Sequence, residues 1–582
     1  MNLHKNTHRR GTAQRKTTAN LSKRLKRWIL SAVCAAAAVM TAGCSRIQDA
    51  YARLSAAAVQ NQAPIELRLW HGFTGREQEA LEALAEEFNA SSGRENRVQL
   101  TLTGYESLPA VAEAVFQAAQ EEAEKTDDLP RLPDLFFSLD DTAYLLDRMG
   151  WAVHMEEFLT EEQRGMFLDS VQAEACPGEN GAMVLFPIGI DTDILLVNES
   201  RWSEFCRETV SEEGEAVFSD RNLVTWEGIG AAAKAYGTWV LEPEGESVPA
   251  SSQEGEEKEE TEDEAEEAAL PILPGSEEFP TFFCTDSWGR LLVAGYESLG
   301  KHMFVSGPDS VQFSFERGKV RSFWSFWSSG WMDGAFAMDS CKEAFASGKA
   351  IACLTSTTQA RSISNRIASQ NGASGVVQLS IRPAPGFSGG NPVTMQETLG
   401  LVLTKSSKEK QAAAQVFLQW LTEERTANLA VATGRLPAMK RANADSILEK
   451  AFRQQGLSAL EQQILKQAKA QLYSHIQLPL AVFDGGSKVI DTMDRLLMEG
   501  GQAVQREYLT LLYPPEPEPE TEPEETEQEE KDDEEQEAEA PSPPDEETIR
   551  AELNSDLAYE EWYISFRDSV VELVLIGQDK AA

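Results

Sequence analysis

The stretch from Ile65 to Asn89, IELRLWHGFTGREQEALEALAEEFN, contains the unit from which the fold is inferred. Apolar and polar residues alternate from Ile65 to Trp70, which is the pattern of a half-buried strand. A turn with two glycines follows at residues 71–75. From Glu77 onward the apolar residues recur every three or four positions, which predicts an amphipathic helix that ends near Asn89. The stretch therefore predicts a strand, a turn and a helix in direct succession.

The same succession continues along the chain. An alternating segment at 98–102 is followed by a predicted helix at 108–124, and a third strand is predicted at 135–137. Residues 181–198 have the pattern of a hairpin-like extended region. Strand–helix alternation of this kind predicts an α/β fold with a largely parallel sheet. Further strands are predicted at 350–354, 376–381 and 399–403, and further helices start at Thr225, dominate 287–349 and cover 408–421.

Length and charge limit the possible functions. The chain has 582 residues, with 95 Asp+Glu against 52 Lys+Arg and a formal net charge of −43. This length is enough for at least two lobes. The charge argues against nucleic acid as a partner, because binding a polyanion needs clustered Lys and Arg. Residues 242–267 hold 13 acids and one base, and residues 514–547 hold 18 acids and one base, so we expect both to be disordered acidic insertions.

The N-terminus has the features of an export signal. Residues 1–27 carry nine Lys and Arg and no acid, and the apolar run at 28–43 is shorter than the about 20 residues of a membrane-spanning helix. The run ends in Thr41-Ala42-Gly43-Cys44, which resembles the lipobox of bacterial lipoproteins. We expect a signal peptide at 1–43, a lipid on Cys44 and a spacer at 44–62. An ordinary signal peptide followed by a chance cysteine is the alternative.

The other cysteines give no metal pattern. They have neither CxxC nor His-paired spacing, so the sequence does not predict a zinc site. One or two disulfides and buried free thiols fit equally well. We expect no metal and no cofactor. The residues are Cys176, Cys206, Cys284, Cys341 and Cys353.

Four groups of segments, taken in order, resemble the family 1 extracellular solute-binding proteins of bacterial ABC importers, which include maltose-binding protein and related sugar-binding lipoproteins. The resemblance depends on the shared order and spacing of the segments, because each alone is weak. The segments are Leu69–Gly75 with 84–89, then Pro133–Phe136, then Phe186–Asn198 with Thr225–Glu227, and finally Ala344–Ala350 with 383–386, 401–421 and Thr433–Pro437.

The resemblance implies a type II periplasmic-binding-protein-like fold. In this fold two α/β lobes are joined by crossing hinge strands and the ligand lies in the cleft between them. The crossings are expected near 186–193 and 383–395. By the same analogy lobe one comprises 64–189 and 391–440, and lobe two comprises 190–385, helices at 441–513 and C-terminal helices at 548–577 that dock on it after the acidic loop at 514–547.

The resemblance also implies a function. The chain is expected to be a monomeric, lipid-anchored protein on the extracellular face of the cell membrane that delivers a carbohydrate to the permease subunits of an ABC importer. A surface sensory co-receptor or an adhesin with the same fold is the alternative. Catalysis is not expected, because no GxSxG, HExxH or Cys/His arrangement stands out.

Candidate ligand-binding residues in lobe one lie at the ends of predicted strands. The turn containing His71, Phe73 and Thr74 precedes a helix whose first N–H groups attract ligand oxygens. Ser138 and Asp140 follow the third strand at its carboxyl end, where open α/β sheets bind ligands. Turn capping is the alternative role for His71, and helix capping for Asp140. Tyr105 is a further aromatic residue at a strand end.

The remaining candidates lie near the hinge and in lobe two. Asp191 and Asp193 are two apart and face the same side if extended, which suits hydroxyl binding or hinge hydrogen bonding better than glycosidase chemistry. Trp288 falls where the resemblance implies a residue that stacks on a sugar, and packing in the core is its alternative. The last candidates are Ser356, Thr357 and Gln359, after a predicted buried strand, and Glu397 in the return crossing.

Overall fold

The computed structural model describes residues 63–123, 132–175, 178, 181–241, 279, 281–306, 311–368, 374–483, 485–514 and 545–579. The expected signal peptide, the lipidated Cys44, the spacer, the acidic insertion at 242–267, Cys176 and residues 515–544 of the acidic loop lie outside the described residues. The described residues from Glu66 onward belong to one compact unit. Among the described helices, none has the length and apolar composition needed to cross a bilayer.

The strands and helices predicted for the first lobe are present. Helix α2 buries Leu81, Leu84, Ala85 and Phe88, the positions that the helical spacing selects. The Phe88 ring contacts the Phe417 ring of α14 at a centroid distance of 5.0 Å. The elements are β1 (Ile65–His71), α2 (Arg76–Ala90), α3 (Ser92–Asn96), β2 (Val98–Gly104), α4 (Leu108–Ala123), β3 (Leu135–Ser138), α5 (Asp140–Arg148), α6 (Glu161–Arg164), α7 (Asp169–Glu174) and α14 (Lys408–Trp420).

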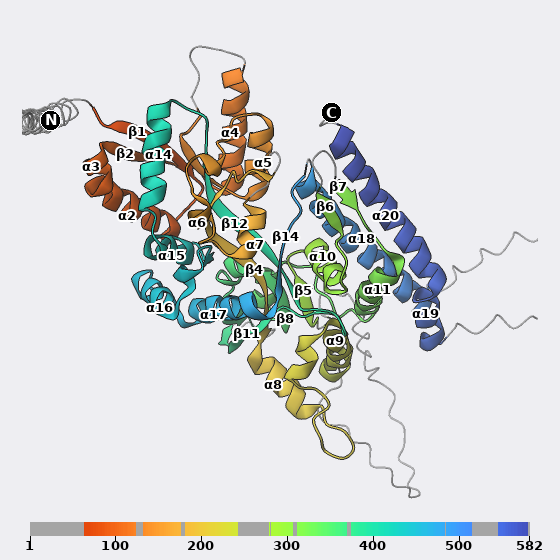
Figure 1. Cartoon of the computed structure of the whole chain (residues 1–582). Helices are drawn as coiled ribbons and strands as arrows, with labels where there is room; N and C mark the ends of the chain where they lie inside the picture. Colours follow the sequence, from red (N-terminus) through yellow and green to blue (C-terminus); the bar gives the residue numbers. More distant parts are fainter. Residues whose placement is uncertain are drawn as a thin grey trace, which may run out of the picture. The chain divides into compact units, whose positions relative to one another are not determined.

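A mixed sheet connects the strands in the order β2-β1-β3-β12-β4-β8-β5 (Figure 1). Strands β1 and β3 are parallel, as are β5 and β8, whereas β12 runs antiparallel to both β3 and β4. The prediction of a largely parallel sheet is therefore wrong, because β12 is antiparallel to β3 and β4, and β4 is also antiparallel to β8. The strands not yet given are β4 (Phe186–Asn198), β5 (Phe283–Thr285), β8 (Ala352–Ser356), β11 (Leu379–Pro383), β12 (Val393–Leu403), β13 (Leu436–Pro437) and β14 (Ile476–Pro479).

Strand β4 runs through both parts of this sheet. Its first residues, from Phe186 to Thr192, pair with β12, and its last residues, from Asp193 to Val197, pair with β8. Within the region 181–198, expected to be hairpin-like, residues 186–198 thus form one continuous strand of 13 residues, all buried. Continuous burial explains the apolar run, since a strand covered on both faces shows little alternation. The exchange of partners falls at Asp191 to Asp193.

Strand β12 makes the return crossing. Its residues from Gly400 to Leu403 pair with β3, and those from Val393 to Gln396 pair with β14. The chain therefore has the two-lobed arrangement, with β4 and β12 as the crossing strands, and the exact residue boundaries of the lobes stay a prediction.

Thr225 caps α9 as expected, since the Gly228 N–H donates to its Oγ1 at 3.1 Å. The other helices are α8 (Glu199–Glu208), α9 (Trp226–Leu241), α10 (Trp288–Ser298), α11 (Arg317–Met332), α12 (Cys341–Ala346), α13 (Thr357–Ala360), α15 (Glu423–Ala432), α16 (Asp445–Gln454), α17 (Ala459–Ser474) and α18 (Gly486–Leu512).

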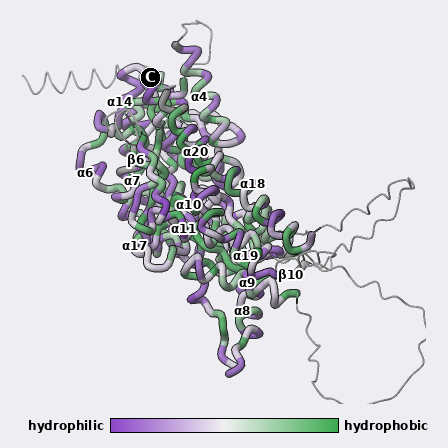
Figure 2. The backbone as a smooth tube through the Cα atoms, turned by 90° about the vertical axis from the view of Figure 1, so that its right-hand side faces the viewer, coloured by the Kyte–Doolittle hydropathy of each residue, from purple (hydrophilic) through white to green (hydrophobic). Residues whose placement is uncertain are grey.

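The C-terminal helices α19 (Glu546–Leu553) and α20 (Asp556–Asp579) lie against the main body (Figure 1). Aromatic side chains hold α20 in place. The Tyr559 ring lies 5.2 Å from that of Trp324, and the Trp562 ring lies 5.8 Å from that of Trp327. Along the helices of Figure 2 the colour alternates between hydrophilic and hydrophobic, as expected for helices with one buried face.

Candidate functional site

Asp191 and Asp193 lie where β4 changes its pairing partner, and both line one cavity of about 210 Å³. Thr192, between them, points to the opposite face, where its Oγ1 is 2.9 Å from Thr394 Oγ1. This geometry follows from the two-residue period of a strand. The prediction that the two carboxylates share a face is confirmed.

The Asp191 carboxylate is held by the start of α13. Thr357 Oγ1 donates to Asp191 Oδ1 at 2.6 Å, and the Thr358 N–H donates to the same oxygen at 3.2 Å. Thr358 Oγ1 donates to the other oxygen. Thr357 is buried and does not line the cavity. Its role in this arrangement is to orient Asp191, because each hydrogen bond fixes one carboxylate oxygen.

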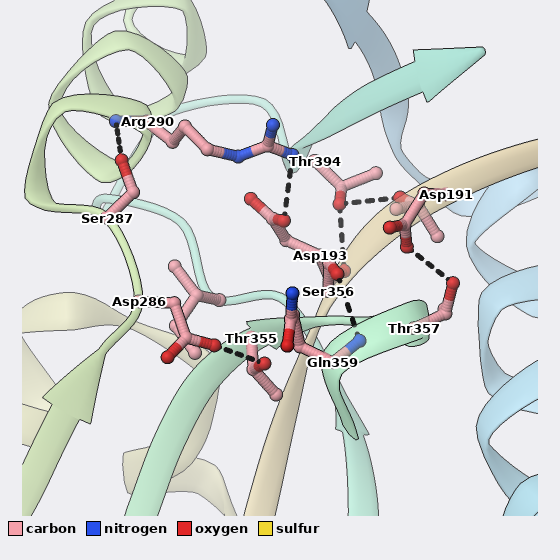
Figure 3. Close-up of polar contacts among 12 residues, drawn as sticks. Asp191, Asp193, Asp286, Ser287, Arg290, Thr355, Ser356, Thr357, Gln359 and Thr394 are labelled. Carbon is pink, nitrogen blue, oxygen red and sulfur yellow. Dashed lines mark hydrogen bonds and ion pairs between the residues drawn. The ribbon is translucent and has the colours of Figure 1, made fainter. Parts of the chain in front are cut away.

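Asp193 forms an ion pair with Arg290 of α10. Arg290 Nη2 lies 3.0 Å from Asp193 Oδ1, and both side chains are largely buried (Figure 3). Burial raises the pKa of Asp193, and the guanidinium opposes that shift. Burial also acts to lower the pKa of Arg290, but Asp193 and Glu397 outweigh it and keep the pKa above its usual value. Arg290 therefore stays charged in the site.

The other walls of the first cavity come from β5, the start of α10, β8 and α13. Thr355 Oγ1 donates to Asp286 Oδ2 at 2.6 Å (Figure 3). Ser287 caps α10 by accepting the Arg290 N–H at 3.0 Å. Ser356 and Gln359, two of the candidates from the sequence, lie in this wall. The lining residues are Asp191, Asp193, Thr285, Asp286, Ser287, Arg290, Leu354, Thr355, Ser356, Thr358, Gln359 and Glu397.

A second cavity of about 320 Å³ adjoins the first, because Ser287, Arg290 and Glu397 line both. Its walls come from the start of α5, the segment after β14 and the start of α18. The rings of Phe304 and Phe483 lie 5.6 Å apart, and both are half-buried. The lining residues are Leu139, Asp140, Asp141, Ser287, Arg290, Phe304, Glu397, Leu480, Ala481, Val482, Phe483, Gly486, Ser487, Ile490, Asp491 and Asp494.

Asp140 lies in this second cavity and is 7% exposed. Its Oδ1 accepts the Asp141 N–H at 3.0 Å, and its Oδ2 has no hydrogen-bond partner among the described residues. It does not cap α5, whose N-cap is Leu139. Burial, followed by the charges of Glu174 and Glu397, raises the pKa of Asp140 well above its usual value.

Glu174, whose charge acts on Asp140, is buried and accepts several hydrogen bonds. Its carboxylate accepts the Thr398 N–H and the Gln396 side-chain amide, each at 2.7 Å. Thr398 Oγ1 donates to it as well, at 2.5 Å. Burial nevertheless raises the pKa of Glu174 to about 7, and these hydrogen bonds oppose the shift. Glu174 fixes β12 beside the site and does not line either cavity.

The structure corrects the role expected for Trp288. This side chain is 2% exposed and its ring is packed among aromatic rings of the lobe-two core, the nearest being Phe336 at 5.0 Å. Ser287 and Arg290, three residues apart, face the cavities, so Trp288 points to another face of the same helical turn. It presents no stacking face to a ligand. Phe304 and Phe483 are the aromatic residues that the second cavity offers.

Apart from Asp140, the lobe-one candidates at strand ends lie outside both cavities. His71 is 2% exposed, and its Nδ1 accepts the Phe73 N–H at 3.2 Å, which is the turn-capping role named as its alternative. The Phe73 ring packs on Phe137 at 4.6 Å. Thr74 is exposed, Tyr105 rests on Trp70 at 5.2 Å, and Ser138 Oγ donates to the Leu139 carbonyl at 2.8 Å.

Three cysteines converge in the lobe-two core. The sulfur atoms of Cys284, Cys341 and Cys353 lie within 4.8 Å of one another, all three residues are buried, and all are free thiols. Sequence spacing gave no sign of this, because the residues come from β5, α12 and β8. Cys206 is also free and is half-buried.

Several residues of the cavities were not selected from the sequence. Arg290 could have been found, since it lies three residues after Ser287 and so shares its helix face. Phe304, Phe483 and Asp494 come from segments whose sequence shows no motif or pattern typical of a binding site. They join the site only because α18 packs beside α10, where Asp494 accepts the Gly289 N–H at 2.7 Å.

Comparison with known proteins agrees with this geometry. A model of the bacterial extracellular solute-binding protein family matches residues 83–452. A cyclic α-maltosyl-1,6-maltose-binding protein from Arthrobacter globiformis is similar in structure, with a TM-score of 0.54 and 13% identity over 76% of this chain and 96% of the other. UgpB from Mycobacterium tuberculosis, in complex with glycerophosphocholine, gives a TM-score of 0.51 and 16% identity over 77% and 97%.

An ABC substrate-binding protein from Listeria monocytogenes, in complex with cycloalternan, gives a TM-score of 0.50 and 11% identity over 76% of this chain and 96% of the other. A search of the curated proteins gives no significant match. The family match covers more than half of the chain, and the similar structures share its two-lobed fold. The chain therefore belongs to the bacterial extracellular solute-binding protein family.

Proposed function

We propose that this chain is the substrate-binding protein of an ABC importer, that a lipid on Cys44 holds it at the extracellular face of the cell membrane, and that its ligand is a carbohydrate. Membership of an extracellular solute-binding family supports the location and the transport role. The same match favours transport over the sensory or adhesive alternative.

The observation that carries the proposal is the convergence of both lobes on one pair of cavities. Asp140 comes from α5 beside β3, and Arg290 comes from α10 beside β5, yet both line the second cavity. The cavities lie where β4 exchanges its pairing partner. A ligand that contacts both walls stabilises the closed arrangement of two lobes, and a transporter can recognise that closed form.

The lining suits a carbohydrate. Sugars present hydroxyl groups at their edges and C–H groups on their ring faces, so their sites combine polar side chains with aromatic surfaces. The first cavity offers the hydroxyl groups of Ser287, Thr355 and Thr358, and the second offers the rings of Phe304 and Phe483. The saccharide ligands named for two of the similar structures agree with this class.

We also propose that the chain binds its ligand without altering it. A glycosidase needs one carboxyl group that donates a proton and a second that acts as base or nucleophile. Here Asp191 accepts hydrogen bonds from α13, and Asp193 is paired with Arg290. Both carboxylates are thus occupied by structural partners.

A thermal-shift screen against a carbohydrate library tests the binding function. A ligand at 100 times its dissociation constant adds about 2.7 kcal/mol to the free energy of unfolding, so a true ligand gives a clear rise in melting temperature. If no carbohydrate raises the melting temperature, the carbohydrate proposal is wrong. If an oligosaccharide is hydrolysed by the wild type but not by Asp191→Asn, the chain is an enzyme.

Metabolic labelling with a fatty acid tests the anchor. The wild type should incorporate the label and stay with the membrane, whereas Cys44→Ser should do neither. Gel filtration with light scattering tests whether the protein is a monomer, as the family resemblance implies. Release of the unlabelled variant to the medium with unchanged ligand binding would separate anchoring from recognition.

A further inference from the structure

The two cavities hold far more negative than positive charge. Eight carboxylates of the described residues line them, against one guanidinium, that of Arg290. Arg290 is itself paired with Asp193. The excess is therefore local to the site and separate from the acidic segments at 242–267 and 514–547. The eight residues are Asp140, Asp141, Asp191, Asp193, Asp286, Glu397, Asp491 and Asp494.

Several of these carboxylates already accept hydrogen bonds from other residues of the protein. Asp191 accepts hydrogen bonds from Thr357 and Thr358, and Asp286 accepts them from Thr355 and the Cys341 N–H. Asp494 accepts from Ser287 and the Gly289 N–H. These groups shape the walls, and their charge is partly balanced by the donors.

Asp140 and Glu397 are different. Asp140 is more than nine-tenths buried and lines the second cavity, and its Oδ2 has no partner among the described residues. The Glu397 side chain is half-buried and lines both cavities, and the charge of Arg290 acts on it without a hydrogen bond between the two. Burying a carboxylate without a partner destabilises a fold. A ligand that supplies a hydrogen-bond donor and a positive charge removes this cost and favours the ionised form of Asp140.

The geometry points to a protonated amine on the ligand, placed in the second cavity between Asp140 and Glu397, and we propose that the ligand is an amino sugar. This inference rests on the proposed carbohydrate-binding function and narrows its substrate class. An ammonium group donates three hydrogen bonds and carries a positive charge, so it can satisfy both carboxylates at once. A neutral hydroxyl group donates one hydrogen bond and leaves the charges unbalanced.

A bound metal ion fits these residues less well than an amine. Calcium needs six to eight oxygen ligands in one shell. Among the described residues, the three cysteines of lobe two form the one group of three or more potential ligands whose atoms converge closely enough for an ion. The carboxylates are instead spread over two adjoining cavities. Spread carboxylates suit an extended organic ligand with its charge at one end.

The rest of the lining indicates a sugar skeleton instead of a simple polyamine. Phe304 and Phe483 provide aromatic surface beside Asp140, and a ring face can rest on either. The hydroxyl groups of Thr355 and Thr358 line the adjoining cavity. A polyamine has no ring face to rest on either aromatic side chain.

Isothermal titration calorimetry with four probes tests the inference on the purified protein. The probes are the glucosamine disaccharide with free amines, its N,N′-diacetylated form, cellobiose and spermidine. The first two share one skeleton and differ in charge at the amine. We expect the free-amine disaccharide to bind about tenfold tighter than the diacetylated form and cellobiose, since a desolvated charge pair exceeds a neutral hydrogen bond.

The variant Asp140→Asn tests where in the site the amine binds. In this variant the preference for the free-amine disaccharide over cellobiose should fall by about tenfold, because the change removes charge and keeps the shape. Glu397→Gln should act in the same direction. Asp445→Asn is the matched control. It removes one negative charge from an exposed side chain of α16 that lines neither cavity. A melting curve of each variant verifies the fold.

The outcomes separate this inference from the proposed function. If cellobiose or the diacetylated disaccharide binds as tightly as the free-amine form, the amine inference is overturned and the carbohydrate proposal stands. If Asp140→Asn and Glu397→Gln both leave the preference for the amine unchanged, its placement is overturned. Binding of spermidine alone, or of no saccharide probe, overturns the amino-sugar inference, and the carbohydrate library screen then decides the carbohydrate proposal by itself.

Discussion

The guanidinium of Arg290 and the carboxylate of Asp193 lie 3.0 Å apart between Nη2 and Oδ1, although 97 residues separate them in the chain. Arg290 sits in the first turn of α10 and Asp193 in the middle of β4. The pair thus joins the helix that carries Ser287 and Arg290 to the strand that crosses between the lobes. It is the charged contact around which the two cavities are arranged.

We expect Arg290→Ala to lower the free energy of unfolding by about 3 kcal/mol, the lower end of the range for breaking a buried ion pair, because the cavity gives water some access to Asp193. Adding Asp193→Asn to this variant should recover part of the loss, since no unpaired charge remains. Urea unfolding of both single variants and the double variant measures this. Equal losses for Arg290→Ala and the double variant would show that the charge of Asp193 is not the cause.

Trp288→Ala should destabilise the fold by about 3–5 kcal/mol, as for a large aromatic side chain removed from a core. Because this ring is buried, its removal leaves a cavity in the core. Phe483→Ala is the matched comparison and should leave the melting temperature close to that of the wild type while weakening carbohydrate binding by about 1–2 kcal/mol, because its ring is half-buried beside the cavity. Melting curves and calorimetry distinguish the two variants. If Trp288→Ala is stable and binds carbohydrate more weakly, Trp288 contacts the ligand and this prediction is wrong.

Glu174 should make stability depend on pH. Its pKa is raised from 4.5 in the unfolded chain to about 7 in the folded protein. The protonated form is therefore favoured by folding, so this contribution is fully present below about pH 4.5 and is lost as the pH rises through about 7. The change is on the order of 3 kcal/mol.

Urea unfolding at pH 5 and pH 8 measures this effect as the difference between the wild type and Glu174→Gln. The variant cannot ionise, so the wild type should lose stability relative to it as the pH rises. Glu174 is one cause of the raised pKa of Asp140, so the difference between wild type and variant reports the coupled titration of Glu174 with its neighbours. A constant difference between the two pH values would contradict the prediction.

Replacing residues 242–267 or 515–544 by a short Gly/Ser linker should leave ligand affinity and fold unchanged. Both segments have few apolar side chains, so ordering them would cost more entropy than burial returns. Closure entropy changes slowly with loop length, and the ends of the second segment are held by α18 and α19. Calorimetry on each replacement measures the affinity. Loss of binding in either would mean that the segment reaches the cleft or a hinge.

Local pattern determined the elements of the first lobe. The alternation from Ile65 to Trp70 and the helical spacing after Glu77 each depend on neighbours within a few residues, and β1 and α2 form where these patterns predict them. The common face of Asp191 and Asp193 follows from the same kind of rule, because a strand repeats every two residues. The order of family-like segments then predicted the two-lobed fold.

Tertiary structure alone decided which residues meet in the site. The apolar run around 181–198 fits a hairpin or a single buried strand equally well, and only its pairing with β12, β8 and β11 makes it one strand. Trp288 and Arg290 are two residues apart, yet the packing of α11 buries the first and the charge of Asp193 holds the second at the cavity. Phe304 and Phe483 meet across 179 residues of chain because α18 packs on α10. Periodicity is a property of neighbouring residues, whereas a binding site is made by contacts between distant ones, and those depend on how the faces of the elements fit together.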